Sequence, residues 1–161
     1  MRMFYAAVVS LALVMATGAT GATHVAPKPS WTCIRGVCLG TSMALMDYRY
    51  GPTWDWEVPV AGGVVQASPV SMKCRTTNRL MMIGTSDPIV RFPDRVQIGT
   101  TIPFGTTWRG YHFFQHGEGG TGWRKQVRAA SGAKVTADAF TYRGKVTGVS
   151  LYLGWGRPCA S

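Results

Sequence analysis

The longest apolar stretch of the chain lies at its N-terminus. Arg2 is followed by twelve residues of moderate hydrophobicity, Phe4 to Met15, and then by small residues. A positive charge, a short apolar segment and small residues together are typical of a signal peptide. Residues 1–22 are therefore expected to direct export, with cleavage near Ala22. Twelve residues are fewer than the roughly 20 that cross a bilayer as a helix, so the mature chain, 23–161, is predicted to be a single exported domain without a transmembrane segment.

In the mature chain, polar and apolar residues alternate in two segments. In Val70–Thr85, Met72 and Cys74 alternate with polar neighbours, at the period of two that a half-buried strand requires. This segment predicts a β-hairpin that turns near Asn78.

The second alternating segment, Ala137–Leu153, has the same form. Its turn is predicted at Arg143-Gly144. The returning strand then presents Val149, Leu151 and Leu153 on one face.

A short block precedes each hairpin. Val37-Cys38-Leu39-Gly40-Thr41-Ser42 returns 59 residues later as Val96-Gln97-Ile98-Gly99-Thr100-Thr101. The hydroxyl residues after each glycine can cap a helix whose first amides lack partners. The blocks thus predict short helices at Thr41–Tyr50 and Thr101–Arg109, before the glycines Gly51 and Gly110.

These patterns predict an α+β fold made of two tandem helix-plus-hairpin repeats that form one mostly antiparallel sheet. The first repeat covers about 35–86 and the second about 94–155. The segment Gly84–Asp94, which contains Pro88 and Pro93, is expected to connect them.

The two blocks, the helix before Gly51 and the hairpin after each block resemble the tandem-repeat fold of the β-lactamase inhibitory proteins. They are also similar to the outer-membrane-assembly lipoproteins of the SmpA/OmlA type, which have one such unit. The resemblance covers roughly Arg35 to Trp155 in pattern and the two blocks in actual residues. It implies helical and antiparallel-sheet units whose sheets join into a concave, aromatic-rich face that grips a protein partner. The chain departs from the inhibitors in its basic charge and in having no cysteine in the second repeat before Cys159.

Four cysteines in an exported chain indicate disulfides, because thiols are oxidised outside the cytoplasm. Three pairings are possible. The favoured one joins Cys33 to Cys38 in a small loop and leaves Cys74 to pair with Cys159. A zinc site is the alternative, but Cys-x4-Cys with two remote cysteines lacks the usual ligand spacing.

The mature chain is basic, with sixteen Lys and Arg after Arg2 is removed against seven Asp and Glu, near +9. The cations are spread from Arg35 to Arg157 without a run of five, so a nucleic-acid-binding arm is not predicted. No cysteine closely follows the expected cleavage site, so a lipid anchor is not predicted either. Anionic envelope polymers, lipid headgroups and acidic proteins are the partners that such charge would attract.

Aromatic residues gather after each block. Tyrosine, tryptophan and arginine dominate interface hot spots because they offer a large area with a polar handle. The residues expected to bind a partner are Tyr50, Trp54, Trp56, Tyr111, Phe113, Trp123 and Arg124. Each of the aromatic residues among them could also fill the core of a small β-rich domain.

Catalytic motifs are sparse. His112-x-x-x-His116-x-Glu118 has a spacing that would suit a metal on a helix, but the surrounding glycines favour a loop. Asp55 and Glu57 would share one face of an extended segment, as a carboxylate pair could in a glycosidase. No catalytic residue or cofactor is predicted.

The sequence thus predicts a secreted or periplasmic, non-enzymatic module that binds a protein partner, with enzyme inhibition as one form of such binding. A cationic binder of anionic envelope components is the first alternative. A small metal-dependent enzyme that uses His112 and His116 is the second.

Overall fold

The computed structural model describes residues 28–71, 75–103, 105–115 and 121–154. Over these ranges the protein has one helix and ten strands. They are β1 (Cys33–Ile34), β2 (Val37–Cys38), α1 (Met43–Tyr50), β3 (Trp56–Val60), β4 (Gly63–Ser68), β5 (Met82–Thr85), β6 (Thr107–Trp108), β7 (Tyr111–Gln115), β8 (Thr121–Arg128), β9 (Lys134–Tyr142) and β10 (Lys145–Leu153). The expected signal peptide, Cys74, Cys159 and His116 lie outside the described residues.

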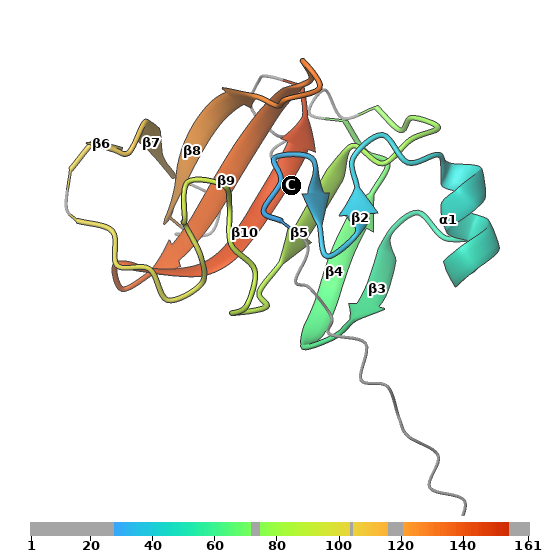
Figure 1. Ribbon diagram of the computed structural model, residues 1–161, viewed down its shortest axis with the longest axis horizontal. Helices are drawn as coiled ribbons and strands as arrows, with labels where there is room; N and C mark the ends of the chain where they lie inside the picture. Colours follow the sequence, from blue (N-terminus) through green and yellow to red (C-terminus); the bar gives the residue numbers. More distant parts are fainter. Residues whose placement is uncertain (1–27, 72–74, 104, 116–120, 155–161) are drawn as a thin grey trace, which may run out of the picture.

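Strands β3 to β10 form one sheet in the order β3-β4-β5-β10-β9-β8-β7-β6. All its neighbouring strands are antiparallel. Figure 1 shows α1 beside β3 at one end of the sheet and β6 with β7 at the other. The fold is therefore mostly antiparallel sheet with a single short helix in the described ranges, which is compatible with the predicted α+β class.

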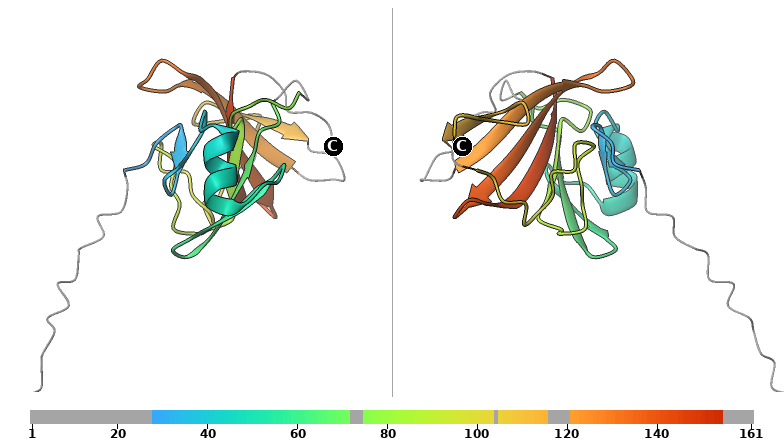
Figure 2. Two further views of the ribbon diagram at one scale, coloured as in Figure 1. Left: turned by 90° about the vertical axis from the view of Figure 1, so that its right-hand side faces the viewer. Right: turned by 60° about the vertical axis from the view of Figure 1, so that its left-hand side comes forward.

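The core lies on one face of the sheet. Because successive strand residues point to opposite faces, Val58, Val65 and Leu151 face this side and are almost fully buried. The β1–β2 hairpin, α1 and the 86–103 connection cover them, through side chains such as Met46 and Phe92. Figure 2 shows the hairpin and the helix against the sheet from one side.

Three two-residue hairpin loops have the sequence Arg-Gly: Arg35-Gly36, Arg109-Gly110 and Arg143-Gly144. In all three loops both residues have positive φ, which is 49° to 50° at the arginine and 75° to 82° at the glycine. Positive φ at both central positions matches the type I′ turn, whose twist suits antiparallel strands. The left-handed conformation costs an L-residue such as arginine about 1–2 kcal/mol, so these turns rest on the pairing of the strands that flank them.

The first predicted helix is confirmed as α1. Ser42 is its N-cap and accepts a hydrogen bond on Oγ from the Leu45 amide at 3.3 Å. The predicted second helix, Thr101–Arg109, is wrong, because the described residues there form an isolated bridge at Thr101 and strand β6. The residues after the second block include Gly105 and β-branched Thr106, which favour helices poorly.

The two blocks nevertheless make the same backbone hydrogen bonds. Gly40 N–H donates to Leu80 O, Leu80 N–H to Thr41 O, and Met43 N–H to Asn78 O, at 2.8, 2.7 and 2.9 Å. In the second block Gly99 N–H donates to Val146 O, Val146 N–H to Thr100 O, and Ile102 N–H to Gly144 O, at 2.8, 2.9 and 2.9 Å. Each block thus pairs with residues at or just before the start of a strand, β5 for the first block and β10 for the second. These two strands are neighbours in the sheet.

Only one of the two predicted hairpins is confirmed. The second is confirmed, with β9 and β10 joined by Arg143-Gly144 and with Val149 and Leu151 buried. The first pairs β5 with β4 rather than with the segment before Asn78, so its predicted turn position is wrong. The connection between these strands is long and contains the bridge between Val70 and Thr76.

Candidate functional site

Three of the aromatic residues predicted to bind a partner belong to the core. Trp56, Tyr111 and Trp123 are almost fully buried, since they face the covered side of the sheet. The Trp56 indole Nε1–H donates to the Gly51 carbonyl at 3.0 Å and ties β3 to the end of α1. Burial raises the pKa of Tyr111 well above its ordinary value, and the Asp94 carboxylate acts in the same direction. These three side chains are not surface groups that a partner could contact.

The other predicted aromatic residues are exposed, but not together. Tyr50 and Trp54 lie in and after α1, and Trp54 is 66% exposed. Phe113 lies on β7, near the opposite end of the sheet. Leu45 and Tyr48 on α1 are exposed as well, Tyr48 by 87%. We call Leu45, Tyr48, Tyr50 and Trp54 the aromatic end of the molecule.

Arg124 is held by an ion pair rather than presented to solvent. Its Nε and Nη2 donate to the two carboxylate oxygens of Asp138 at 2.8 and 2.6 Å. The Asp138 side chain is buried, and the guanidinium carbon of Arg124 lies 4.3 Å from the centre of the Phe114 ring. The neighbouring Lys125 pairs with Asp94 at 3.1 Å on the core side. Both cations are therefore occupied within the fold.

The face of the sheet opposite the core carries a row of mostly polar residues that crosses all eight strands. Facing residues in neighbouring strands point to the same side of a sheet. The row is Glu57, Gln66, Gly84, Ser150, Asp138, Arg124, His112 and Thr107. Sheet pairing thus brings residues nearly a hundred positions apart onto one face of the sheet.

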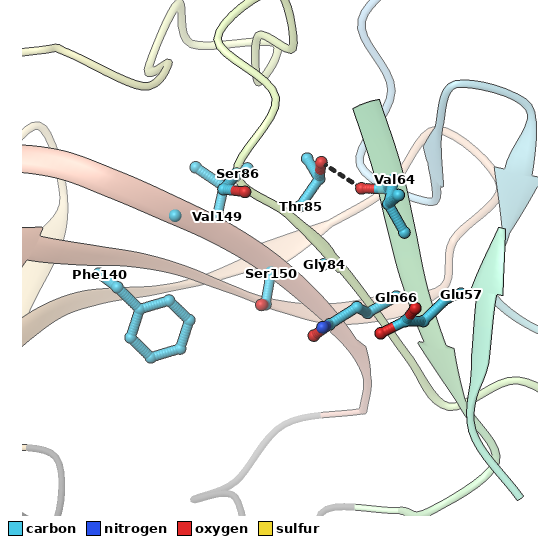
Figure 3. Close-up of a pocket in the computed structure, with 10 residues that line it drawn as sticks. Glu57, Val64, Gln66, Gly84, Thr85, Ser86, Phe140, Val149 and Ser150 are labelled. Carbon is cyan, nitrogen blue, oxygen red and sulfur yellow. Dashed lines mark hydrogen bonds between the residues drawn. The ribbon is translucent and has the colours of Figure 1, made fainter. Parts of the chain in front are cut away.

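The β3 half of this face is hollowed. A cavity of about 320 Å³ is lined by Glu57, Gln66, Gly84, Ser150 and Phe140, among others. Figure 3 shows the Glu57 and Gln66 side chains beside one another, with Ser150 and Phe140 on the neighbouring strands. We call this cavity, together with an adjoining one that also contains Glu57 and Gln66 in its lining, the polar groove.

A second cavity of about 290 Å³ shares Glu57 and Gln66 with the first, so the two adjoin one another. Asp55, the residue after Trp54, also lines it. The aromatic end therefore adjoins the polar groove. No lysine or arginine is among the described residues that line either cavity.

Glycines in this face make room for side chains of the row and its neighbours. A Cβ on Gly84 would lie 2.5 Å from the Ser150 Oγ, so the absence of a side chain lets Ser150 lean over β5.

Tyr152 lies on the same face of β10 as Ser150. Burial raises the pKa of Tyr152 to about 12, with a further contribution from Asp138. Tyr152 therefore stays neutral at ordinary pH and adds no charge to this face.

Acidic side chains divide into two groups. Three of the six in the described residues form ion pairs: Asp87 with Arg35, Asp94 with Lys125, and Asp138 with Arg124. Asp47, Asp55 and Glu57 form no ion pair with another described residue. All three of these lie in or beside the aromatic end and the groove. Arg49 on α1 is the one cation within residues 45–57, against three acids, so this part of a basic protein is acidic.

The predicted histidine site is only half described. His112 is exposed on β7, and His116 and Glu118 lie outside the described residues. Within the described ranges no three His, Cys, Asp or Glu side chains gather as a metal site would need. The metal-dependent alternative stays a prediction.

The favoured disulfide is found between Cys33 and Cys38, which face one another across β1 and β2 with an S–S distance of 2.08 Å. Such bonds are typical of proteins in oxidising compartments. No helix in the described part of the chain is long and apolar enough to cross a membrane.

Comparisons of the chain with protein families, with curated proteins and with solved structures find no match.

The sequence did not predict that Gln66, Ser150 and Asp138 share one face of the sheet. A signal was present in β9, where Thr136 and Asp138 alternate with small and apolar residues. What the sequence did not supply was the strand order that aligns them with Glu57.

Proposed function

We propose that this protein is an exported recognition module that binds a protein partner through the aromatic end and the adjoining polar groove. The observation that carries the proposal is the combination, within residues 45–57, of exposed aromatic side chains and acids without a described cationic partner. Exposed apolar patches on proteins usually mark contact surfaces.

The partner's surface is expected to be basic. Asp47, Asp55 and Glu57 would meet lysine or arginine side chains, and complementary charge speeds encounter and sets register. Tyr48 and Trp54 would supply the buried anchors of the interface, since hot spots are enriched in tyrosine and tryptophan. The polar groove would receive an extended side chain or backbone segment next to those anchors.

The disulfide and the signal-peptide pattern favour action outside the cytoplasm. Within the sheet, β3-β4-β5 and β10-β9-β8 are arranged symmetrically about the β5–β10 pair, with β7 and β6 beyond β8, and the two blocks share their hydrogen bonds. We infer from this that the two halves are repeats of one unit in which β6 and β7 replace the second helix. The resemblance to β-lactamase inhibitory proteins makes inhibition of an enzyme one form that the binding would take.

The test is affinity capture by the mature, oxidised protein from culture supernatant and envelope extract, read by mass spectrometry. Tyr48→Ala and Trp54→Ala are compared with wild type. Tyr142→Ala is the matched control, because Tyr142 is an aromatic residue that is 63% exposed at the β9–β10 turn, far from α1 (Figure 1).

A partner protein should be retained by wild type and by the control and lost from the two variants. Hot-spot truncations cost about 1 to 4 kcal/mol of binding free energy each, and melting temperatures should hardly change because both side chains are exposed. Equal retention by all four proteins would contradict the assignment of this surface.

The cationic-binder alternative is favoured by one observation, the excess of arginine over acid outside the aromatic end. Since Arg124 and Lys125 are ion-paired, other cations must carry such binding. Exposed candidates on the connecting segments are Arg75, Arg79, Arg91 and Arg95.

A further inference from the structure

A separate cavity of about 620 Å³ lies where the start of the described chain meets the β1–β2 hairpin and the residues that follow β5. Its lining combines cations and apolar side chains. The cations are Lys28, Arg35 and Arg91, and the main apolar residues are Ile34, Ile89 and Val90. The volume is in the range of sites that hold small organic molecules, roughly 300 to 1,000 Å³.

The charge of this cavity is positive. Asp87, the acid near it, is buried and already engaged: Oδ2 accepts from Arg35 at 3.4 Å, and Oδ1 accepts from the Ile89 amide at 2.9 Å. Arg35 directs only Nε and Nη2 at Asp87, and a guanidinium has five N–H donors. Lys28 and Arg91 form no ion pair with another described residue. No acidic side chain is among the described lining residues.

The apolar part of the lining is partly open to solvent. Ile34 and Val90 are buried, whereas Ile89 is 61% exposed. An isoleucine left in water beside three cations gains from covering by a hydrocarbon, at about 25 cal/mol for each Å² removed from water. A small inorganic anion would satisfy the cations and leave Ile89 in water.

We propose that this cavity binds a single-chain anionic amphiphile, a hydrocarbon chain that ends in a carboxylate. The head would lie among Arg35, Arg91 and Lys28, and the chain would cover Ile89 and reach toward Ile34 and Val90. The site is distinct from the aromatic end, and the inference does not depend on the function proposed above.

The experiment is isothermal titration of the mature protein with dodecanoate below its critical micelle concentration. Dodecyltrimethylammonium has the same chain with a cationic head, and acetate has the same head without the chain. Arg91→Gln and Ile89→Asn change the cavity at exposed positions, so folding should be retained, as thermal unfolding will check. Lys145→Gln removes an exposed charge at the start of β10, far from the cavity in sequence, and is the control.

Dodecanoate should bind at one site per chain, and neither acetate nor dodecyltrimethylammonium should compete. Arg91→Gln and Ile89→Asn should each weaken binding about three- to tenfold, and Lys145→Gln should leave it unchanged.

Three results would overturn the proposal: no binding of dodecanoate, equal binding of the cationic amphiphile, or loss in the Lys145→Gln control equal to that in Arg91→Gln. Vesicles of phosphatidylglycerol separate this site from a membrane surface. If both cavity variants bind the vesicles as tightly as wild type does, and monomeric dodecanoate does not bind, the vesicles are bound by a general cationic surface instead.

Discussion

Arg124 shows how the role of a side chain depends on its cross-strand neighbour. Its residue type is typical of binding surfaces, and the sequence predicted it in one. The register of β8 and β9 places it opposite Asp138, fourteen residues later in the chain, with its guanidinium over Phe114. A shift of one residue in this register would turn the side chain to the other face, and the sequence alone does not specify the register.

Replacement of Arg124 should therefore lower stability rather than binding. Arg124→Met removes the guanidinium that pairs with the buried Asp138 carboxylate, and breaking a buried pair in this way costs about 3–5 kcal/mol. The double variant Arg124→Met/Asp138→Leu should recover most of the loss, because an apolar pair of similar volume is often neutral. Urea denaturation measures the unfolding free energy of both variants. A single variant that loses less than about 1 kcal/mol, the scale of a surface pair, would contradict the burial of this ion pair.

Among the elements, the sequence predicted those whose determinants are local. The cap at Ser42 and Gly51 after the last turn specify α1. Alternation and a two-residue turn specify the β9–β10 hairpin. The second helix failed because similarity to the first block ends where helix-forming residues would be needed. Strands β3 and β4 were not predicted, since Pro59 weakens the strand pattern at what proves to be a sheet edge.

The pairing of β7 with β8 depends on a glycine opposite an aromatic ring. Gly122 faces Phe114, and a Cβ there would lie 2.6 Å from the ring. Gly122→Ala should push Phe114 away from β8 and from Arg124, at a cost of about 1–3 kcal/mol, as for other overpacked sites. Gly132→Ala is not a suitable control because of its positive φ, so Thr147→Ala, at an exposed site on β10, serves instead. Equal unfolding free energies for Gly122→Ala and Thr147→Ala would show that Phe114 moves without cost.

Over the whole molecule, charge is segregated in a way that composition hides. The chain has a net charge of +10, yet the acids without a described ion pair cluster near the aromatic end, while a cation-lined cavity lies at the β1–β2 hairpin. The sequence predicted Tyr50 and Trp54 as surface residues because they lie at the end of a predicted short helix and in the segment after it. It could not separate them from Trp56, because that distinction requires knowing which face of β3 is covered.

This segregation predicts different kinetics for two kinds of variant at the aromatic end. In the proposed interface Asp55 and Glu57 act at long range, so Asp55→Asn/Glu57→Gln should mainly slow association with the captured partner and reduce the salt dependence of the rate. Trp54→Ala removes buried contact area and should mainly speed dissociation, with about 1 to 4 kcal/mol lost. Surface plasmon resonance at low and physiological salt measures both rates. If the Asp55→Asn/Glu57→Gln variant associates faster than wild type, the partner surface is acidic and the basic partner inferred here is wrong.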